Sequence, residues 1–402
     1  MESNDKDRPD NNRMMPLLWV DSSAIINVVK YNTTHVSTQM RYAIEPSGSI
    51  ENTLLWVSLI TGNITVDGNG GYLHQPAIDR TQSCNMPYLF DTSRFQMPVL
   101  IFSKDTFLDV CARRAQQIKA IADKQRKQIV IMYSGGVDST CIICAFILVF
   151  GEQFVRDNIV LMMNNDSIEE NQQFYNDFIV GKIRTINSNN FNTTIDPTQY
   201  VIVTGDPGGA LEGGGVLRTI LVDYRDSIDS PSWKDQIRKY HSKLFVTSLY
   251  NSDKLNYADY FIQSIEHSAA SRGLSITNLF DCFWWYLINF KWMSMSLNIY
   301  KNCRGVLEAN RRGIDFWFEH VIPFYGSDEF VLWSYSNRQH MLNLRCSMPW
   351  PAYYKRAFKD VIYLVNHDSD YLNYKGKDAR LRRAISPGQS IFALTNDMAP
   401  II

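Results

Sequence analysis

The amino-acid sequence predicts an α/β protein with a parallel sheet, a small β-rich N-terminal domain and a helical C-terminal region. From residue 112 to about 203, strand-forming and helix-forming segments alternate, which is the pattern of βαβ units whose strands run parallel. Before residue 110, short apolar runs are broken by turn residues, which indicates a small β or α+β domain. Beyond Pro231 and up to about Ile385 the segments are aromatic and compatible with helices.

The elements of the α/β core follow from hydrophobic periodicity. In chain order we expect a helix at 112–127, a strand at 128–132, a helix at 138–150, a strand at 158–163, a helix at 167–183 and a strand at 200–203. In the N-terminal domain, β-like runs at 54–60 and 97–102 lie on either side of a glycine-rich turn at 67–71.

The length of 402 residues exceeds what one hydrophobic core usually supports, so two or three domains are expected. Residues 1–13 are polar and charged, and they predict a disordered tail. We place the N-terminal domain at 14–110, the α/β core at 111–230 and the helical part at 231–402, where it completes a cleft above the sheet.

Composition favours a soluble, cytoplasmic protein. The formal net charge of −1 offers no general attraction to nucleic acid, so a nucleic-acid partner is possible but not favoured. Seven cysteines in so long a chain do not resemble a disulfide framework. The N-terminus has no apolar signal segment, and the longest apolar run, residues 141–150, is too short to cross a membrane, so no membrane partner is expected.

The most informative segment is SGGVDST at residues 134–140, which connects the predicted strand 128–132 to an apolar helix. Two glycines allow a tight turn and a close approach of the backbone to a ligand. The loop and the helix N-terminus then present unpaired amide groups, which suit a phosphate or pyrophosphate. A simpler interpretation is a turn in which Asp138 or Ser139 caps the helix.

Each polar residue of the segment has an expected role. Hydroxyl groups can add donors for the phosphates, and a carboxylate is suited to Mg²⁺ bound to those phosphates. The segment is neither a Walker A loop nor a Rossmann fingerprint, because both patterns are absent. The predicted phosphate-binding residues are Ser134, Gly135, Gly136, Asp138, Ser139 and Thr140, with Asp138 also as a metal ligand.

The segment resembles the S-G-G-x-D-S signature of the PP-loop ATP pyrophosphatases. This resemblance implies an adenine nucleotide alpha-hydrolase-like fold, binding of ATP and Mg²⁺, and transfer of AMP to a carboxylate, amide or carbonyl oxygen with release of pyrophosphate. A nitrogen or sulfur nucleophile then displaces AMP. In this family the end of the second strand meets the adenine ring, which here assigns that contact to Met163 and Asn164.

Two further segments are similar to the asparagine-synthetase branch. The segment VTGDPGGALEGG at 203–214 resembles that branch's S-G-x-G-x-D-E-x-F-G-G, without its Asp-Glu pair. It assigns Gly205 to the nucleotide and Asp206 to the metal. The segment VIPFYGSDEFV at 321–331 resembles V-P-F-L-D-x-x-F-V, and YKRAFKD at 354–360 resembles the segment with the pyrophosphate-binding lysine. Lys355 is the first candidate for that lysine and Lys359 the second, although a single lysine is often only a solvated surface residue.

Asparagine synthetase carries a glutaminase domain that begins with a catalytic cysteine, and this chain has Glu2 and Ser3 after Met1. We therefore expect an adenylating ligase, similar to an amidotransferase without glutaminase, that uses ammonia or an amine as nucleophile. Its substrate would be a small molecule with a carboxyl or amide oxygen. Two alternatives stay open: a nucleobase-modifying enzyme acting on tRNA or a free deazaguanine, and a non-catalytic ATP-binding protein.

Three other features have competing interpretations. Glu170 could act as a catalytic base beyond the second strand, or it could form a capping box with Ser167. Cys141 and Cys144 lie in an apolar helix, where core packing is favoured over metal binding. The aromatic segment 282–292 predicts a buried helix, with base stacking as the alternative.

Overall fold

The computed structural model describes residues 79–84, 95–188, 199–213, 228–244, 257–292, 295 and 320–376, together with four two-residue strands nearer the N-terminus. These short strands are β1 (Leu18–Trp19), β2 (Val66–Asp67), β3 (Gly70–Gly71) and β4 (Leu89–Phe90). The predicted tail at 1–13 and the predicted run at 54–60 lie outside the described residues.

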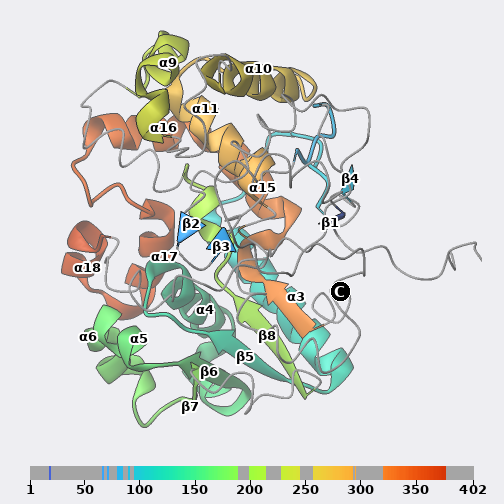
Figure 1. Cartoon of the computed structure of the whole chain (residues 1–402). Coiled ribbons are helices and arrows are strands. Elements are labelled where there is room, and N and C mark those ends of the chain that lie inside the picture. Colours follow the sequence, from blue (N-terminus) through green and yellow to red (C-terminus); the bar gives the residue numbers. More distant parts are fainter. Residues whose placement is uncertain are drawn as a thin grey trace, which may run out of the picture.

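A five-stranded sheet lies in the lower half of the view in Figure 1, and all its strands run parallel. Its strands in spatial order are β7 (Arg184–Asn187), β6 (Ile159–Met163), β5 (Gln128–Met132), β8 (Tyr200–Thr204) and β9 (Val321–Pro323). The parallel α/β fold expected from the sequence is thus confirmed. The strand at 128–132 has the predicted bounds.

The central strands consist mostly of apolar residues and are buried on both faces. Every residue of β6 is buried, and β5 pairs with it from Ile129↔Ile159 to Met132↔Met162. Such continuous apolar strands are typical of parallel sheets that are covered on both sides. The edge strand β9 pairs with β8 but is far from it in the sequence, because β8 ends at Thr204 and β9 begins at Val321.

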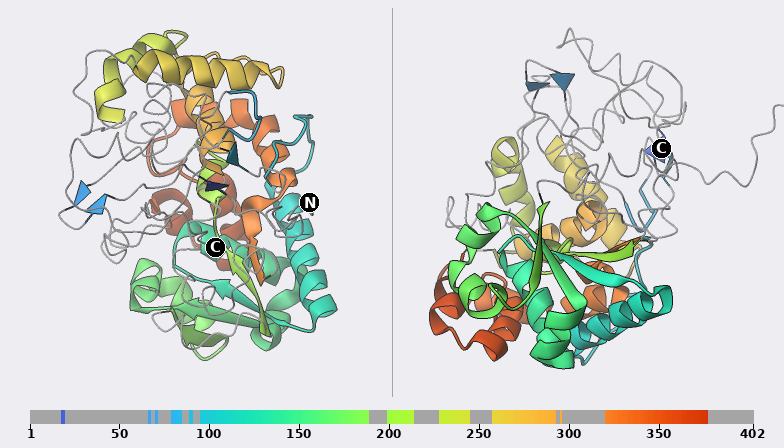
Figure 2. Two further views of the ribbon diagram at one scale, coloured as in Figure 1. Left: turned by 45° about the vertical axis from the view of Figure 1, so that its right-hand side comes forward. Right: turned by 90° about the horizontal axis from the view of Figure 1, so that it is seen from below.

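Helices α3 (Phe107–Gln125) and α4 (Val137–Asn158) pack against the strands of this sheet, and α17 (Arg356–Asn366), from a distant part of the sequence, packs against both helices (Figure 2). Helix α3 starts five residues before the expected position, because Thr106 and Asp109 form a capping box there. Helix α4 continues past its expected end at 150, with a kink at Gly151, where φ is 83°.

Among the described helices, α4 alone is long and apolar enough to cross a membrane by length and composition. Half of its most apolar stretch is buried, and the helix packs against α3, α17 and the sheet. Cys141 and Cys144 are fully buried in this packing. A core helix of a soluble protein packs in this way.

The expected single helix at 167–183 is instead three short segments: α5 (Asn165–Glu170), α6 (Gln172–Phe174) and the π-helical η1 (Tyr175–Ile179). The predicted capping box of Ser167 with Glu170 is wrong. Asn164 is the N-cap of α5, and it forms a capping box with Ser167 at the third helical position. The helix therefore starts immediately after β6, and Glu170 becomes its last residue.

A helical region lies beyond the carboxyl ends of the strands, with α9 (Trp233–Leu244) and α10 (Tyr257–Ala270) at its outer side (Figure 1). Helix α11 (Leu279–Trp285) continues into the π-helical η5 (Tyr286–Lys291), and both are buried along their length. The indole nitrogen of Trp284 donates to Ser334 Oγ at 2.8 Å and that of Trp285 to Ser268 Oγ at 2.8 Å. The predicted buried aromatic helix is confirmed, and its indole rings are in the core rather than available to bases.

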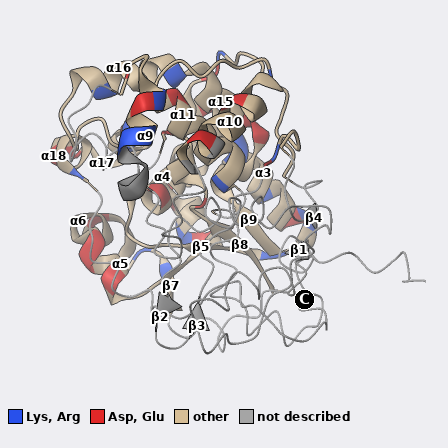
Figure 3. Ribbon diagram, turned by 45° about the horizontal axis from the view of Figure 1, so that its top comes forward, with Lys and Arg blue, Asp and Glu red and all other residues tan. Residues whose placement is uncertain are grey.

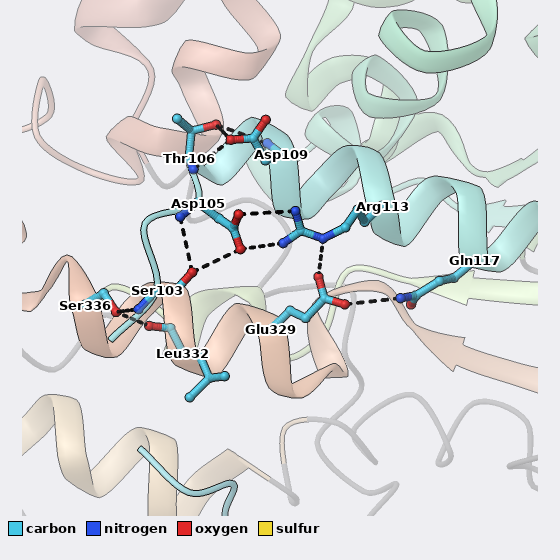
Figure 4. Close-up of polar contacts among 9 residues, drawn as sticks. All are labelled: Ser103, Asp105, Thr106, Asp109, Arg113, Gln117, Glu329, Leu332 and Ser336. Carbon is cyan, nitrogen blue, oxygen red and sulfur yellow. Dashed lines mark hydrogen bonds and ion pairs between the residues drawn. The ribbon is translucent and has the colours of Figure 1, made fainter. Parts of the chain in front are cut away.

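The segment after β9 is fastened to α3 by charged side chains. It comprises η6 (Phe324–Gly326), α15 (Asp328–Ser336) and α16 (Arg338–Ser347), and α18 (Ser369–Tyr374) follows α17. Arg113 on α3 pairs with Glu329 at 2.7 Å and with Asp105 at 2.6 Å (Figure 4). Arg114 donates to the carbonyl oxygen of Pro323, the last residue of β9, at 2.9 Å and to that of Phe324 at 3.0 Å. These contacts place β9 and η6 beside the core.

The N-terminal region agrees only in part with the expectation. Strands β2 and β3 form an antiparallel pair at the predicted glycine-rich turn. The predicted strand at 97–102 is instead an irregular segment, and Val99, Ile101 and Phe102 are exposed. Apolar runs become strands only where a neighbouring strand pairs with them, and none of the described strands pairs with this run.

Charges of both signs are spread over the described elements (Figure 3).

Candidate functional site

The strand order creates a switch point between β5 and β8. From β5 the chain adds β6 and then β7 on one side, and it then places β8 on the other side of β5. In open parallel sheets, ligands bind at the carboxyl ends of the two strands that flank such a reversal. The loops that follow these two strands are residues 133–136 and 205–212, so the two glycine-containing segments of the sequence meet at one place.

The loop after β5 makes a turn that requires glycine at its third position. Gly135 has φ of +74°, and a Cβ there would lie 2.2 Å from the carbonyl oxygen of Ser167 and 2.8 Å from the Cβ of Glu170. The loop therefore rests directly on α5. Gly136 is the N-cap of α4 and provides no side-chain cap, which leaves the first amide groups of the helix without a capping side chain. These amides and the helix dipole are suited to an anion.

The hydroxyl groups of the loop are arranged around Gly136. Ser139 Oγ and Thr140 Oγ1 donate to the Gly136 carbonyl oxygen at 3.1 and 3.0 Å, and Ser139 Oγ also accepts from the Ser134 amide. Both side chains are buried, whereas Ser134 is exposed with its Oγ 3.2 Å from Ser139 Oγ. Ser139 and Thr140 therefore shape the turn, and Ser134 is the hydroxyl nearest to solvent.

Asp138, in the first turn of α4, forms an ion pair with Lys355. Lys355 is the N-cap of α17, 217 positions later in the chain, and its side chain is 11% exposed. Burial acts to lower the pKa of Lys355, but the charge and hydrogen bond of Asp138, together with Tyr354 and Glu212, outweigh it, and the pKa lies above its ordinary value. The structure thus brings the first predicted lysine to the predicted phosphate loop.

The loop after β8 packs against the same aspartate. A Cβ on Gly205 would lie 3.2 Å from the Asp138 Cβ, and a Cβ on Gly208 would lie 2.6 Å from Asp138 Oδ1. The Tyr325 hydroxyl donates to the Asp138 carbonyl oxygen at 2.9 Å. Gly205 and Gly208 therefore allow the second loop to approach the first.

Asp206, the second predicted metal ligand, is partly buried and precedes a cis peptide bond to Pro207. In the described part of the chain, no group of three or more His, Cys, Asp or Glu residues is arranged to hold a metal ion. A metal at this site would therefore depend on few protein ligands and on the ligand's own oxygens.

Glu170 and Lys375 form a second ion pair beside the loop. The Lys375 ammonium donates to Glu170 Oε1 at 2.7 Å and to the Glu170 carbonyl oxygen at 2.6 Å, and both side chains are largely buried. A carboxylate already paired in this way stabilises the end of α5 on which Gly135 rests. Met163, the predicted adenine contact, is buried at the end of β6, and Asn164 follows it as the α5 N-cap.

Lys359, the second predicted lysine, occupies a different environment from Lys355. It is fully buried, and its ammonium donates to the carbonyl oxygen of Pro351 at 3.0 Å, with those of Ala352 and Lys375 at 3.4 and 3.5 Å. Burial, with a smaller effect of Arg356, lowers the pKa of Lys359 to about 8. These hydrogen bonds connect α17 to the turn that precedes it and so serve a structural role.

Buried polar atoms without a hydrogen-bond partner gather around these loops. In the part of the chain that the structure describes, such atoms belong to Tyr133, Asp138, Glu170, Asn171, Thr204, Glu212 and Tyr371, and to three residues elsewhere. Native proteins leave few buried polar atoms unsatisfied, and a concentration of them marks a place where water or a polar ligand completes the hydrogen bonding.

Sequence reasoning missed Tyr325, Gly208 and Arg345. Arg345 donates to the carbonyl oxygen of Glu212 and lies within 4.0 Å of its carboxylate. No local pattern identifies this pairing, because the two residues are 133 positions apart. Gly208 belonged to the quoted segment, and its close approach to Asp138 depends on the packing of two loops.

Comparison of the chain with protein-family models, with curated proteins and with solved structures finds no match.

Proposed function

We propose that the chain binds ATP at the carboxyl ends of β5 and β8 and is an adenylating ligase of the PP-loop type. One observation carries this proposal: the loop at 134–140 lies at the switch point with a buried lysine aimed at its aspartate. Uncapped helix amides, hydroxyls and a cation are the groups that recognise phosphates. The resemblance to the S-G-G-x-D-S signature gives the class of reaction.

The residues present fit Mg²⁺ bound together with the nucleotide. Asp138 has one carboxylate oxygen that is buried without a hydrogen-bond partner in the described part of the chain, and Mg²⁺ is commonly held by one or two carboxylates plus phosphate oxygens. Asp138 would hold the ion, with Asp206 as the second predicted ligand. When bound, the ion would neutralise phosphate charge.

The chain's own groups explain how pyrophosphate could depart. A carboxyl or amide oxygen of the substrate attacks the α-phosphorus of ATP, the bond from that phosphorus to the bridging oxygen breaks, and pyrophosphate leaves with the electron pair. The Lys355 ammonium and the α4 amides are placed to stabilise the negative charge that develops on the leaving group. Ammonia or an amine would then displace AMP.

The products of ATP distinguish this reaction from other uses of ATP. Incubated with candidate carboxylic and amide substrates plus ammonia, the protein should form AMP and pyrophosphate in equal amounts. Asp138→Asn should lower the rate by about 10²-fold or more, because the carboxylate that would hold the ion beside the phosphates is lost. ADP as the product would contradict the assignment.

A non-catalytic nucleotide-binding protein is the second candidate, and one observation favours it. Glu212, an acidic residue of the second loop, is paired with Arg345 instead of facing Asp138. Binding of ATP without any AMP formation over a broad substrate panel, including nucleobases and tRNA, would favour this candidate.

A further inference from the structure

Glu212 is a buried carboxylate that lies behind Lys355. It ends the loop after β8 and is 4% exposed. Arg345 from α16 donates to its carbonyl oxygen, and the Arg345 guanidinium lies 4.0 Å from Glu212 Oε2 and 5.0 Å from the centre of the Phe280 ring. Burial raises the pKa of the Glu212 carboxyl group, and the positive charges of Arg345 and Lys355 oppose this rise.

The same carboxylate reaches the start of α17. Glu212 Oε1 accepts a hydrogen bond from the amide of Ala357, the second residue of the helix, at 3.4 Å. Lys355, the N-cap, provides no side-chain cap of its own. A carboxylate from another part of the chain thus takes the place of a capping side chain, and its negative charge faces the positive end of the helix dipole.

Lys355 needs such support because its backbone conformation is unfavourable. Its φ of 49° and ψ of 44° lie in the left-handed region, which residues with a Cβ rarely adopt. This conformation directs the side chain to Asp138. The loop that carries Glu212 also packs its Gly208 against Asp138, so one loop contacts Asp138 and the first turn of the helix that follows Lys355.

We propose that Glu212 is a positioning residue that holds Lys355 over the phosphate loop and thereby sets the affinity of the site for the pyrophosphate part of its ligand. This inference rests on the proposed function, which gives Lys355 its phosphate ligand. Glu212 touches neither nucleotide nor substrate in this scheme, and it acts through the first turn of α17 and through its charge.

The test is calorimetric titration of the full-length protein with inorganic pyrophosphate and, separately, with AMP. Glu212→Gln should weaken pyrophosphate binding about tenfold and leave AMP affinity within about twofold, because only the lysine side of the site is disturbed. In a Lys355→Met background the same substitution should cause no further loss, because the two residues act together. Glu329→Gln is the matched control. Glu329 also pairs with an arginine, but this ion pair joins α15 to α3 and does not involve Glu212 or Lys355 (Figure 4).

The possible results test the role of Glu212 separately from the proposed function. Unchanged pyrophosphate affinity in Glu212→Gln, or an equal loss of pyrophosphate and AMP affinity, would overturn the inference while leaving the proposed function intact. A wild-type protein that binds neither probe would refute both. If Glu212→Gln does not fold, Glu212→Asp, which keeps the charge on a shorter side chain, should give a smaller selective loss of pyrophosphate affinity, and unaltered affinity would again refute the role.

Discussion

At the scale of single residues, Lys355 and Lys359 show how the structure separates two similar candidates. They are one helical turn apart and both are buried. Lys355 meets the carboxylate of Asp138, whereas Lys359 meets main-chain carbonyl oxygens. An ammonium paired with a carboxylate at a loop can exchange that partner for phosphate, and an ammonium enclosed by carbonyls serves stability.

Replacing each lysine by methionine should separate these roles. Lys359→Met should lower the free energy of unfolding by about 1–3 kcal/mol, because buried carbonyl oxygens lose a charged donor. Lys355→Met should lower ATP affinity about tenfold or more, since charge-assisted bonds to phosphate are lost. Chemical denaturation and nucleotide titration of both variants measure this. Equal effects on stability and on affinity in the two variants would show that the distinction is wrong.

A third lysine gives a pH-dependent prediction. Burial lowers the pKa of Lys291, in η5, from 10.5 to about 7. Between these values the unfolded chain holds the proton and the folded chain does not, so stability from this group increases as pH rises through that window. From pH 7 to 9 the unfolding free energy of the wild type should rise relative to Lys291→Met by on the order of 1–2 kcal/mol. A constant or falling difference in denaturant titrations would contradict it.

The strand–loop–helix arrangement around residues 134–140 could be predicted because its pattern is local: glycines, hydroxyls and an acid follow a buried strand directly. The pairing of Asp138 with Lys355 depended on a resemblance at residues 354–360, since no periodicity links positions 217 apart. The pairs Glu170–Lys375 and Glu212–Arg345 could not be predicted at all. Each depends on how helices from the end of the chain pack against loops of the sheet.

At the scale of elements, α5 supports the glycine loop that follows β5. Its start was misassigned because Ser167 and Glu170 fit a capping box, yet Asn164 caps the helix three residues earlier. Both patterns satisfy the same local rule, and the earlier one is used because β6 ends at Met163. The earlier start brings Ser167 and Glu170 under Gly135, where the loop needs a surface to rest on.

Two glycine substitutions separate backbone strain from the contact with α5. Gly135 and Gly151 both have positive φ, but a Cβ at Gly151 would have nothing within 4 Å. Gly151→Ala should cost about 1 kcal/mol of stability from strain alone, whereas Gly135→Ala should cost more than about 2 kcal/mol and weaken ATP binding. Thermal unfolding with and without ATP compares the two. A Gly135→Ala protein as stable as Gly151→Ala would mean that the loop does not rest on α5.

At the scale of the whole molecule, the sheet combines four strands from residues 128–204 with a fifth strand from residues 321–323. The alternation over residues 112–203 predicted three strands, which are β5, β6 and β8, and their parallel direction, because each is apolar and is separated from the next by a helix or loop. It did not predict β7, whose side chains are mostly exposed. It could not predict β9 as a sheet strand, since three residues beside β8 carry too little pattern. Nor could it predict the strand order, which places the two glycine loops together.

The most direct test is equilibrium binding of ATP with Mg²⁺ to the full-length protein, with inorganic pyrophosphate as competitor. We expect one ATP per chain, displaced by pyrophosphate, and an affinity at least about tenfold weaker in folded Asp138→Asn protein. Absence of binding, or binding that neither pyrophosphate nor Asp138→Asn affects, would contradict the claim that residues 134–140 hold the phosphates of a nucleotide.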